Sequence, residues 1–204
     1  MSKPTLTFIG HASLKFKTAD GKIIYVDPFF KGDYSDIAVV LLVTHNHSDH
    51  NAVNLVKKFE NCLVVTPKEA LANGCYNIFE QGDIKITAVQ AYNSKHNIDE
   101  YVGYVLEFDS LKIYCAGDTS KTEDMINKLS KMGLDYALLP IDGIFNMNAK
   151  EGSECAEILN VRHAIPIHNN PLCTVTGLYS KKGVSKFAHA GKIVMKFGET
   201  IELN

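Results

Sequence analysis

The chain has 204 residues, 46% of them hydrophobic, and a formal net charge of −2. This composition predicts a globular protein with a substantial core, and we expect a single domain over residues 1–204. The basic residues are scattered, with their densest group at 181–186 (KKGVSK). That distribution argues against an extended nucleic-acid-binding surface, because such a surface needs a basic stripe.

The five cysteines are far apart and form no C-x-x-C pair. They predict thiols in a reducing compartment rather than a disulfide framework. The N-terminus carries no apolar segment typical of a secretion signal, and no apolar run is long enough to cross a bilayer. We therefore expect a cytoplasmic protein without membrane association, with a homo-oligomer as an open alternative.

The first half of the chain is predicted to alternate strands with turns and then with strand–helix units. Helical spacing predicts a helix over 51–59 (NAVNLVKKF). The segment 66–69 (TPKE) has the form of a capping box with proline at the first helical position, so a short helix is predicted there, ending at Asn73-Gly74. Apolar patterns predict strands over residues 5–9, 12–17, 22–26, 37–43 and 62–66.

The second half repeats this organisation. Helices are predicted over 122–132, which Gly133 ends, and over 149–159, where Asn148 and Glu151 are placed to cap the start. Two similar halves of strands and strand–helix units predict an α/β sandwich. Strands are predicted over residues 84–91, 101–108, 111–116, 135–140 and 163–167, with two short ones between 192 and 203.

The most informative segment is 44-THNHSDH-50, which follows an apolar run. In an extended segment the side chains of His45 and His47 leave on the same side, while Asp49 and His50 lie at the turn that follows. A single tetrahedral zinc ion with its water does not need four such ligands, whereas two neighbouring ions could share them in pairs. The segment therefore predicts a metal centre rather than a polar turn.

This segment resembles the H-x-H-x-D-H signature of the metallo-β-lactamase superfamily. The other metal-binding positions of that superfamily are matched, in the same order along the chain, by His96 in QAYNSKHN, Asp118 in AGDT and His168 in IPIH. The stretches FIGHASL, VDPFF and LLPIDG most resemble its compact subgroup of lactonase-like and UPF0173-type hydrolases. The resemblance implies a four-layer αββα sandwich of two similar halves.

The resemblance also implies a centre of two divalent ions, with zinc as the first expectation and manganese or iron as alternatives. A hydroxide that bridges the ions would be the nucleophile, because water between two dications loses a proton far more readily than bulk water. Asp49 would orient this hydroxide and later accept its proton. The implied ligands are His45, His47 and His96 for one ion, Asp49, His50 and His168 for the other, and Asp118 as the bridge.

Three further expectations concern single residues. The loop of His96 departs from the commoner "GH" pattern of the superfamily, so Tyr92 or Asn93 could lie nearer the metals. His11 lies in the GHAS hairpin, which faces the site in the resembling subgroup. We expect His11 either to contact substrate or to be an ordinary hydrogen-bonded histidine. Asp27, which ends a strand in the first half, is expected to brace the loop that carries the ligands.

The segments expected to line a substrate pocket are His11, the loop 29–34, in which Lys31 is the cation, Tyr92-Asn93, and 142–148, which contains Asn146. A small molecule is the expected substrate because the chain carries no basic stripe for nucleic acid. Aromatic candidates for the pocket walls, each with burial in the core as the alternative, are Phe29, Phe30 and Phe145.

Motifs of other mechanisms are absent, since the chain has no G-x-S-x-G, no P-loop and no H-E-x-x-H. His47 stands where the di-iron, oxygen-reducing branch of the resembling superfamily has a glutamate, so hydrolysis is favoured over redox chemistry. We predict a metal-dependent hydrolase of a small-molecule ester, lactone, amide or phosphodiester. The alternatives are a non-catalytic protein that binds metal and a metabolite, and a subunit whose active partner is another chain.

Overall fold

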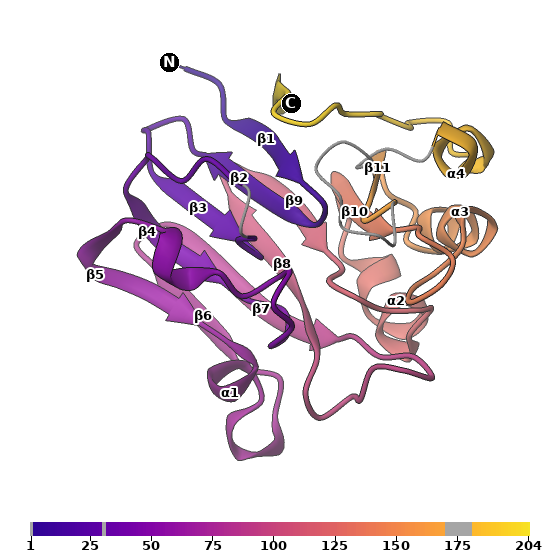
Figure 1. Cartoon of the computed structure of the whole chain (residues 1–204), viewed down its shortest axis with the longest axis horizontal. Helices are drawn as coiled ribbons and strands as arrows, with labels where there is room; N and C mark the ends of the chain where they lie inside the picture. Colours follow the sequence, from indigo (N-terminus) through magenta and orange to yellow (C-terminus); the bar gives the residue numbers. More distant parts are fainter. Residues whose placement is uncertain (1, 30–31, 170–180) are drawn as a thin grey trace.

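The computed structural model describes residues 2–29, 32–169 and 181–204. These residues form two six-stranded sheets that pack face to face (Figure 1). The first sheet contains, in spatial order, β12 (Thr200–Glu202), β1 (Thr5–Gly10), β2 (Ser13–Lys17), β3 (Ile23–Val26), β4 (Ala38–Leu42) and β5 (Lys58–Val65). The second contains β11 (His163–Ile167), β10 (Tyr136–Pro140), β9 (Leu111–Cys115), β8 (Val102–Phe108), β7 (Ile84–Gln90) and β6 (Ile78–Gln81).

The two sheets share one pairing pattern. In the first sheet, β1, β2 and β3 pair antiparallel, and β3, β4 and β5 pair parallel. In the second, β6 to β9 pair antiparallel, and β9, β10 and β11 pair parallel. The predicted α/β sandwich of two similar halves is therefore confirmed. Residues that follow the parallel strands come out at their carboxyl ends, where ligands bind in sheets of this kind.

The main core lies between the sheets, where buried side chains such as Phe16 and Tyr104 pack together. Burial of each large apolar side chain contributes about 1.5–3 kcal/mol. A second apolar cluster joins the outer face of the second sheet to α2 (Glu123–Asn127), α3 (Ala149–Ile158) and α4 (Lys181–Lys186). The helical layer expected on this side is therefore present, and α2 and α3 lie beside β10 in Figure 1.

The outer face of the first sheet has a thinner cover. Tyr34 and the residues around the short 3₁₀ helix η1 (Val53–Leu55) pack there on Tyr25 and Leu41. The two outer layers therefore differ, because one is built from α-helices and the other from a loop and a single helical turn.

The helix predicted over 51–59 is wrong. Only Val53–Leu55 are helical, and β5 begins at Lys58. Ala52, at the position before this turn, offers no side-chain hydrogen bond to the free N–H groups of a helix start. The sheet captures the backbone instead, since Lys58 pairs with Ala38 of the neighbouring strand. Tertiary pairing therefore outweighs the apolar spacing of this segment.

The predicted helix caps are confirmed. Thr66 and Glu69 form the capping box of α1 (Pro67–Ala70), and the Thr66 N–H donates to Glu69 Oε2 at 3.0 Å. The Asn148 side chain accepts two backbone N–H groups at the start of α3. Among the helices of the described ranges, none is long and apolar enough to span a bilayer.

Candidate metal centre

The candidate site residues follow the carboxyl ends of parallel strands in both sheets. In the first sheet, Asp27 follows β3 and the segment 44–50 follows β4. In the second, Asp118 follows β9, Asp142 follows β10 and His168 follows β11. Each sheet therefore supplies part of the site, and its geometry depends on how the two halves pack.

The turns that carry these residues hold the backbone in the left-handed region. The φ angle is 56° at His11, 48° at Asp27 and 43° at His168. Gly117 also has a positive φ, and a Cβ there would lie 2.9 Å from Thr44 Cβ, so only glycine fits. The His168 N–H donates to the His11 carbonyl at 2.8 Å, which ties the turns of the two sheets together. Strained turns of this kind cluster at functional sites, at about 1–3 kcal/mol each.

Asp27 organises the end of β4. Its Oδ1 accepts from the Thr44 N–H at 2.7 Å, and its Oδ2 accepts from the Thr44 hydroxyl at 2.7 Å and from His50 Nδ1 at 3.1 Å. Because the Thr44 hydroxyl proton goes to Asp27, its oxygen accepts from His45 Nδ1, which lies 3.0 Å away. In their neutral forms His45 and His50 therefore present an unprotonated Nε2. This is the bracing role predicted for Asp27.

These imidazoles meet the carboxylate of Asp118. His50 Nε2 lies 3.6 Å from Asp118 Oδ1, and His168 Nε2 lies 3.5 Å from Asp118 Oδ2. His168 Nδ1 makes an ion-pair contact of 3.0 Å with Asp142 Oδ2. His45, His50 and Asp118 offer ligand atoms that all lie within 4.8 Å of one another. We call His45, His50, Asp118 and His168 the inner cluster, and all four side chains are buried.

The inner cluster fits a divalent metal ion. Among the described residues, His45 Nε2, His50 Nε2 and Asp118 Oδ1 are buried without a hydrogen-bond partner. Buried polar atoms are nearly always satisfied, so three such atoms in one place indicate side chains arranged around a ligand. Imidazole nitrogens and carboxylate oxygens are the ligand types that zinc, manganese and iron take in proteins.

Burial and charge oppose each other in the inner cluster. Burial favours a lower pKa for His50, but the carboxylates of Asp118 and Asp27 outweigh it and raise the pKa to about 9. Burial favours a higher pKa for Asp118, but His168 and His50 hold it well below its usual range. Burial and the nearby His50 lower the pKa of His45 to about 2. Binding of a cation would therefore displace the His50 proton and replace its charge.

The partly exposed Asp49 extends the inner cluster toward solvent, and the buried His11 contacts it. His11 Nε2 lies 3.0 Å from Asp49 Oδ2, and the His11 ring centroid lies 3.8 Å from that of His168. Together with His50 and His168, these two residues offer four ligand atoms within 4.8 Å of one another. Burial lowers the pKa of His11 to about 4, which keeps its imidazole neutral. His11 thus stands among the candidate metal ligands, a place that its sequence context did not indicate.

His47, His96 and Tyr101 form a second group, which we call the outer cluster. The exposed His47 has its Nε2 at 2.9 Å from the Tyr101 hydroxyl. The Tyr101 ring lies nearly parallel to those of His45 and His96, with centroid distances of 4.6 Å to each. Asn93 Nδ2 donates to His96 Nδ1 at 3.0 Å, so the neutral His96 carries its proton on Nε2. In the described part of the chain, neither histidine joins a group of ligand atoms within 4.8 Å.

Of the other predicted pocket residues, some border the site and others do not. Asn146 Nδ2 donates to Asp142 Oδ2 at 2.8 Å, and Asn93 Nδ2 donates to the Phe145 carbonyl at 2.9 Å, so both amides border the site. Phe29 is fully buried in the apolar cluster on the outer face of the first sheet, which is the core alternative stated for it. Two further candidates, Phe30 and Lys31, lie outside the described residues.

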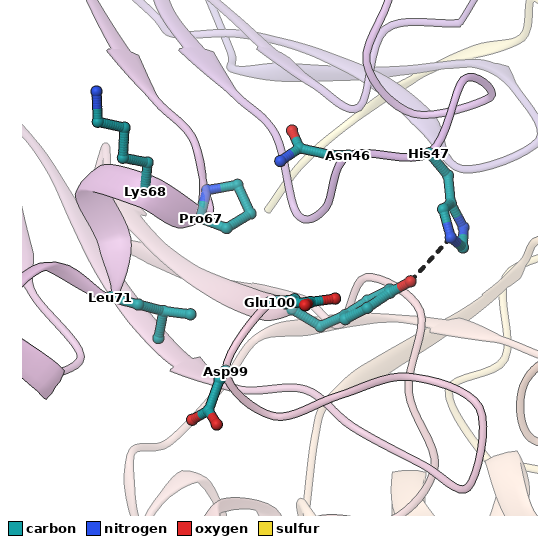
Figure 2. A pocket seen from close by; sticks show the side chains of 8 residues that line it. Asn46, His47, Pro67, Lys68, Leu71, Asp99 and Glu100 are labelled. Atoms are coloured by element: carbon teal, nitrogen blue, oxygen red, sulfur yellow. Dashed lines mark hydrogen bonds between the residues drawn. The ribbon is translucent and has the colours of Figure 1, made fainter.

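A pocket of about 560 Å³ adjoins the outer cluster (Figure 2). His47 and Tyr101 belong both to the outer cluster and to the pocket lining, and the hydrogen bond between them is the dashed line in Figure 2. Across the pocket from this pair lie Pro67 and Leu71, in and just after α1. The lining residues are Asn46, His47, Pro67, Lys68, Leu71, Asp99, Glu100 and Tyr101.

Sequence reasoning missed Thr44 and Tyr101 as site residues and did not place Asp142 beside His168. Thr44 had a signal, because it directly precedes the histidine cluster and hydroxyls commonly support buried imidazoles. Asp142 also had one, since it follows a buried strand as Asp27 does. Tyr101 had none, because its contacts arise only when the two sheets pack together.

Comparison with known proteins places this geometry in a family. The family model described as "Beta-lactamase superfamily domain" matches residues 5–168. A UPF0173 metal-dependent hydrolase of Thermococcus onnurineus is 35% identical, over 96% of this chain and 98% of its own. Another, from Pyrococcus furiosus, is 32% identical over 97% of this chain and 99% of its own.

Solved structures agree with the sequence matches. A Parabacteroides distasonis protein assigned as a metal-dependent hydrolase superposes with a TM-score of 0.72 at 27% identity, covering 94% of this chain and 91% of its own. Igni18, a metallo hydrolase of Ignicoccus hospitalis, has a TM-score of 0.76 at 20% identity, covering 100% and 99%, and this likeness shows the fold. The chain therefore belongs to the beta-lactamase superfamily and, within it, to the UPF0173 metal-dependent hydrolases.

Proposed function

We propose that this hydrolase cleaves a small-molecule ester, lactone or phosphodiester at a centre of two divalent ions. The observation that carries the proposal is the set of three buried ligand atoms in the inner cluster, on His45, His50 and Asp118, that have no hydrogen-bond partner among the described residues. A merely structural cluster would satisfy these atoms with protein hydrogen bonds. Zinc is the preferred ion, with manganese and iron as the other metals that suit imidazole and carboxylate ligands.

The two ion positions have unequal support from the described contacts. The inner residues already present their ligand atoms, whereas His96 Nδ1 accepts a hydrogen bond from the Asn93 amide. For His96 to bind an ion through Nε2, Asn93 would have to turn its amide oxygen toward Nδ1. The outer position is therefore the weaker one. The proposed ligands are His45, His47 and His96 for the outer ion, Asp49, His50 and His168 for the inner ion, and Asp118 between them.

The protein's own groups have distinct parts in the proposed hydrolysis. The ions, when bound, polarise the scissile bond and lower the pKa of water at the site. Asp27 and Asp142 hold the imidazoles of His50 and His168 in place through their Nδ1 atoms. Asp49 is the proposed proton acceptor, because its side chain is 23% exposed and can exchange the proton with solvent. No serine or cysteine nucleophile is needed.

We propose that the pocket beside the outer cluster receives the body of the substrate. Its volume of about 560 Å³ lies in the range of small-molecule sites, roughly 300–1,000 Å³. Pro67 and Leu71 give it an apolar side. Lys68 is the cation of the lining, against the carboxylates of Asp99 and Glu100. This balance disfavours a polyanion such as nucleic acid.

The test begins with metal content per chain, measured by elemental analysis on protein purified without added metal or chelator. The protein is then screened with nitrophenyl esters, aliphatic lactones and bis(nitrophenyl) phosphate, with zinc or manganese in the buffer as the background. Two ions per chain and turnover of one substrate class above background support the proposal. Metal binding without any turnover would favour the alternative, a non-catalytic protein that binds metal and a metabolite.

A further inference from the structure

Tyr101 occupies an unusual place for a buried aromatic residue. It directly precedes β8, and the Val102 N–H that follows it donates to the Thr44 carbonyl at 3.0 Å. This bond ties Tyr101 to the start of the histidine segment, because Thr44 directly precedes His45. The Tyr101 residue is only 6% exposed. Its phenol therefore has a fixed position relative to the candidate ligands.

The Tyr101 ring contacts every imidazole of the proposed outer ion position. It lies nearly parallel to the rings of His45 and His96, and it meets His47 nearly at right angles with a centroid distance of 5.7 Å. Ordinary core packing would account for contacts with one or two of these rings. Contact with all three, by one phenol, indicates a residue that sets their relative orientation.

The Tyr101 hydroxyl makes a directed contact with the ring nitrogen of His47. The Nε2-to-hydroxyl distance is 2.9 Å, and within the described ranges this is the hydrogen bond that holds the His47 ring. This hydrogen bond of His47 is the dashed line in Figure 2.

The same arrangement recurs in the inner cluster with different partners. One nitrogen of His50 is held by Asp27, and one nitrogen of His45 is held by Thr44, which leaves the other nitrogen for an ion. Ligating histidines in proteins almost always have their second nitrogen fixed in this way. Tyr101 supplies the corresponding contact for His47, but at Nε2 rather than Nδ1.

We infer that Tyr101 is the positioning residue of the outer metal position: its hydroxyl fixes His47 Nε2, so that His47 binds the ion through Nδ1. The inference deepens the proposed function and rests on it. In the metal-bound state the His47 ring proton lies on Nε2, and the Tyr101 oxygen accepts it. The two closely packed imidazoles, His45 and His96, prevent the phenol from turning away when the ion binds.

The test compares Tyr101→Phe with the matched control Tyr104→Phe. Tyr104 lies three residues later, within β8, and its hydroxyl also makes a buried hydrogen bond, to the Val43 carbonyl at 2.8 Å. Zinc affinity is measured by competition with a chromophoric chelator, and the cobalt-substituted proteins are compared by their visible spectra. Tyr101→Phe should weaken the second zinc ion by about 10–100-fold, the usual effect of losing such a partner, and should alter the cobalt spectrum. Tyr104→Phe should change neither.

Equal zinc affinity and an unchanged cobalt spectrum in Tyr101→Phe would overturn the inference. A second measurement needs no variant and covers a loss of folding in Tyr101→Phe. Wild-type protein labelled with ¹⁵N and loaded with ¹¹³Cd should show metal–nitrogen coupling to Nδ1 of His47, and coupling to Nε2 overturns the inference.

These readouts separate the inference from the proposed function. Wild-type protein that binds two ions but hydrolyses none of the screened substrates would count against the proposed function. The cadmium coupling to His47 would then still decide the Tyr101 inference. Wild-type protein that binds no divalent ion would overturn both, because Tyr101 would then have no metal ligand to position.

Discussion

The inner and outer clusters receive ligands from the same short segment, yet they provide very different surroundings. His45 is fully buried, and the hydroxyl that holds its ring is itself bonded to a buried carboxylate. His47, two residues later, is exposed and is held by a neutral phenol. The difference teaches that a ligand motif specifies residue types, whereas the packing around each residue sets how firmly an ion is held.

The carboxylates account for the contrast in charge. Asp27, Asp118 and Asp142 all contact the imidazoles of the inner cluster, and they favour a cation there. Removal of one partner from a buried charge pair costs about 3–5 kcal/mol, because the other charge remains buried and unpaired. The outer cluster has no such carboxylate contact among the described hydrogen bonds of His47 and His96. We therefore expect the inner ion to bind first and to leave last.

The largest effect is expected from Asp118→Asn. This change removes the charge that faces both His50 and His168, while keeping the size of the side chain. Both ions should be lost, and hydrolysis should fall by more than about 100-fold, because second-shell losses alone cost up to that factor. Elemental analysis per chain checks the first result. If Asp118→Asn retains the inner ion and loses only the outer one, the carboxylates do not account for the stronger binding inferred for the inner ion.

A smaller effect is expected from Asp27→Asn. The carboxamide cannot accept all the hydrogen bonds from Thr44 and His50 that the carboxylate accepts, so both inner imidazoles lose their orientation. Zinc affinity of the inner position should fall by about 10–100-fold. Chelator competition measures this zinc affinity. The control is Asp36→Asn, because Asp36 forms an exposed ion pair with Lys15 away from the site. Wild-type affinity in Asp27→Asn would mean that the buried carboxylate does not distinguish the clusters.

His96→Ala should be milder still. Because His96 Nδ1 already accepts from Asn93, its ring contributes least to the proposed ligands. We expect the inner ion to remain in every chain and only the outer ion to bind more weakly. Stepwise titration with zinc distinguishes the two ions. Loss of both ions in His96→Ala would show that the outer position supports the inner one, contrary to the order of strength inferred here.

The smallest effect concerns the pH dependence of stability in metal-free protein. The pKa of His50 is raised to about 9, so its stabilisation is full below about 6.5 and is lost as the pH rises through 9. The pKa of His45 is lowered to about 2 and that of His11 to about 4, so stability also falls as the pH drops below about 6.5.

The melting temperature of chelated protein should therefore be highest near pH 6.5 and lower by a few degrees at pH 9. Thermal melts across this range check the prediction. In His50→Gln the alkaline decline should become smaller, with the raised pKa of His168 as a remaining contribution, and a decline of equal size in that variant would assign it to another group.

Sequence and structure agree best where a local pattern has a local cause. The capping box at Thr66 formed because its two partners are three residues apart. Asp27 was expected to brace the site, because it ends a strand in the first half as Asp118 does in the second and is followed directly by Pro28. Tyr101 was invisible to the same reasoning, because its contact with His47 joins residues 54 positions apart. The predicted helix over 51–59 failed for a similar reason, since strand pairing with Ala38 lies outside any local window.

The left-handed turns at His11, Asp27 and His168 strain the backbone, which lowers the stability of the fold, while their side chains build the site on which activity depends. Glycine at any of these positions would relax the backbone by about 1–2 kcal/mol, which offsets part of the packing lost with the side chain. Selection for heat resistance alone would therefore tolerate glycine at the very residues that build the site. A relative that carries glycine at these turns is expected to have kept the α/β sandwich fold and lost its catalytic activity.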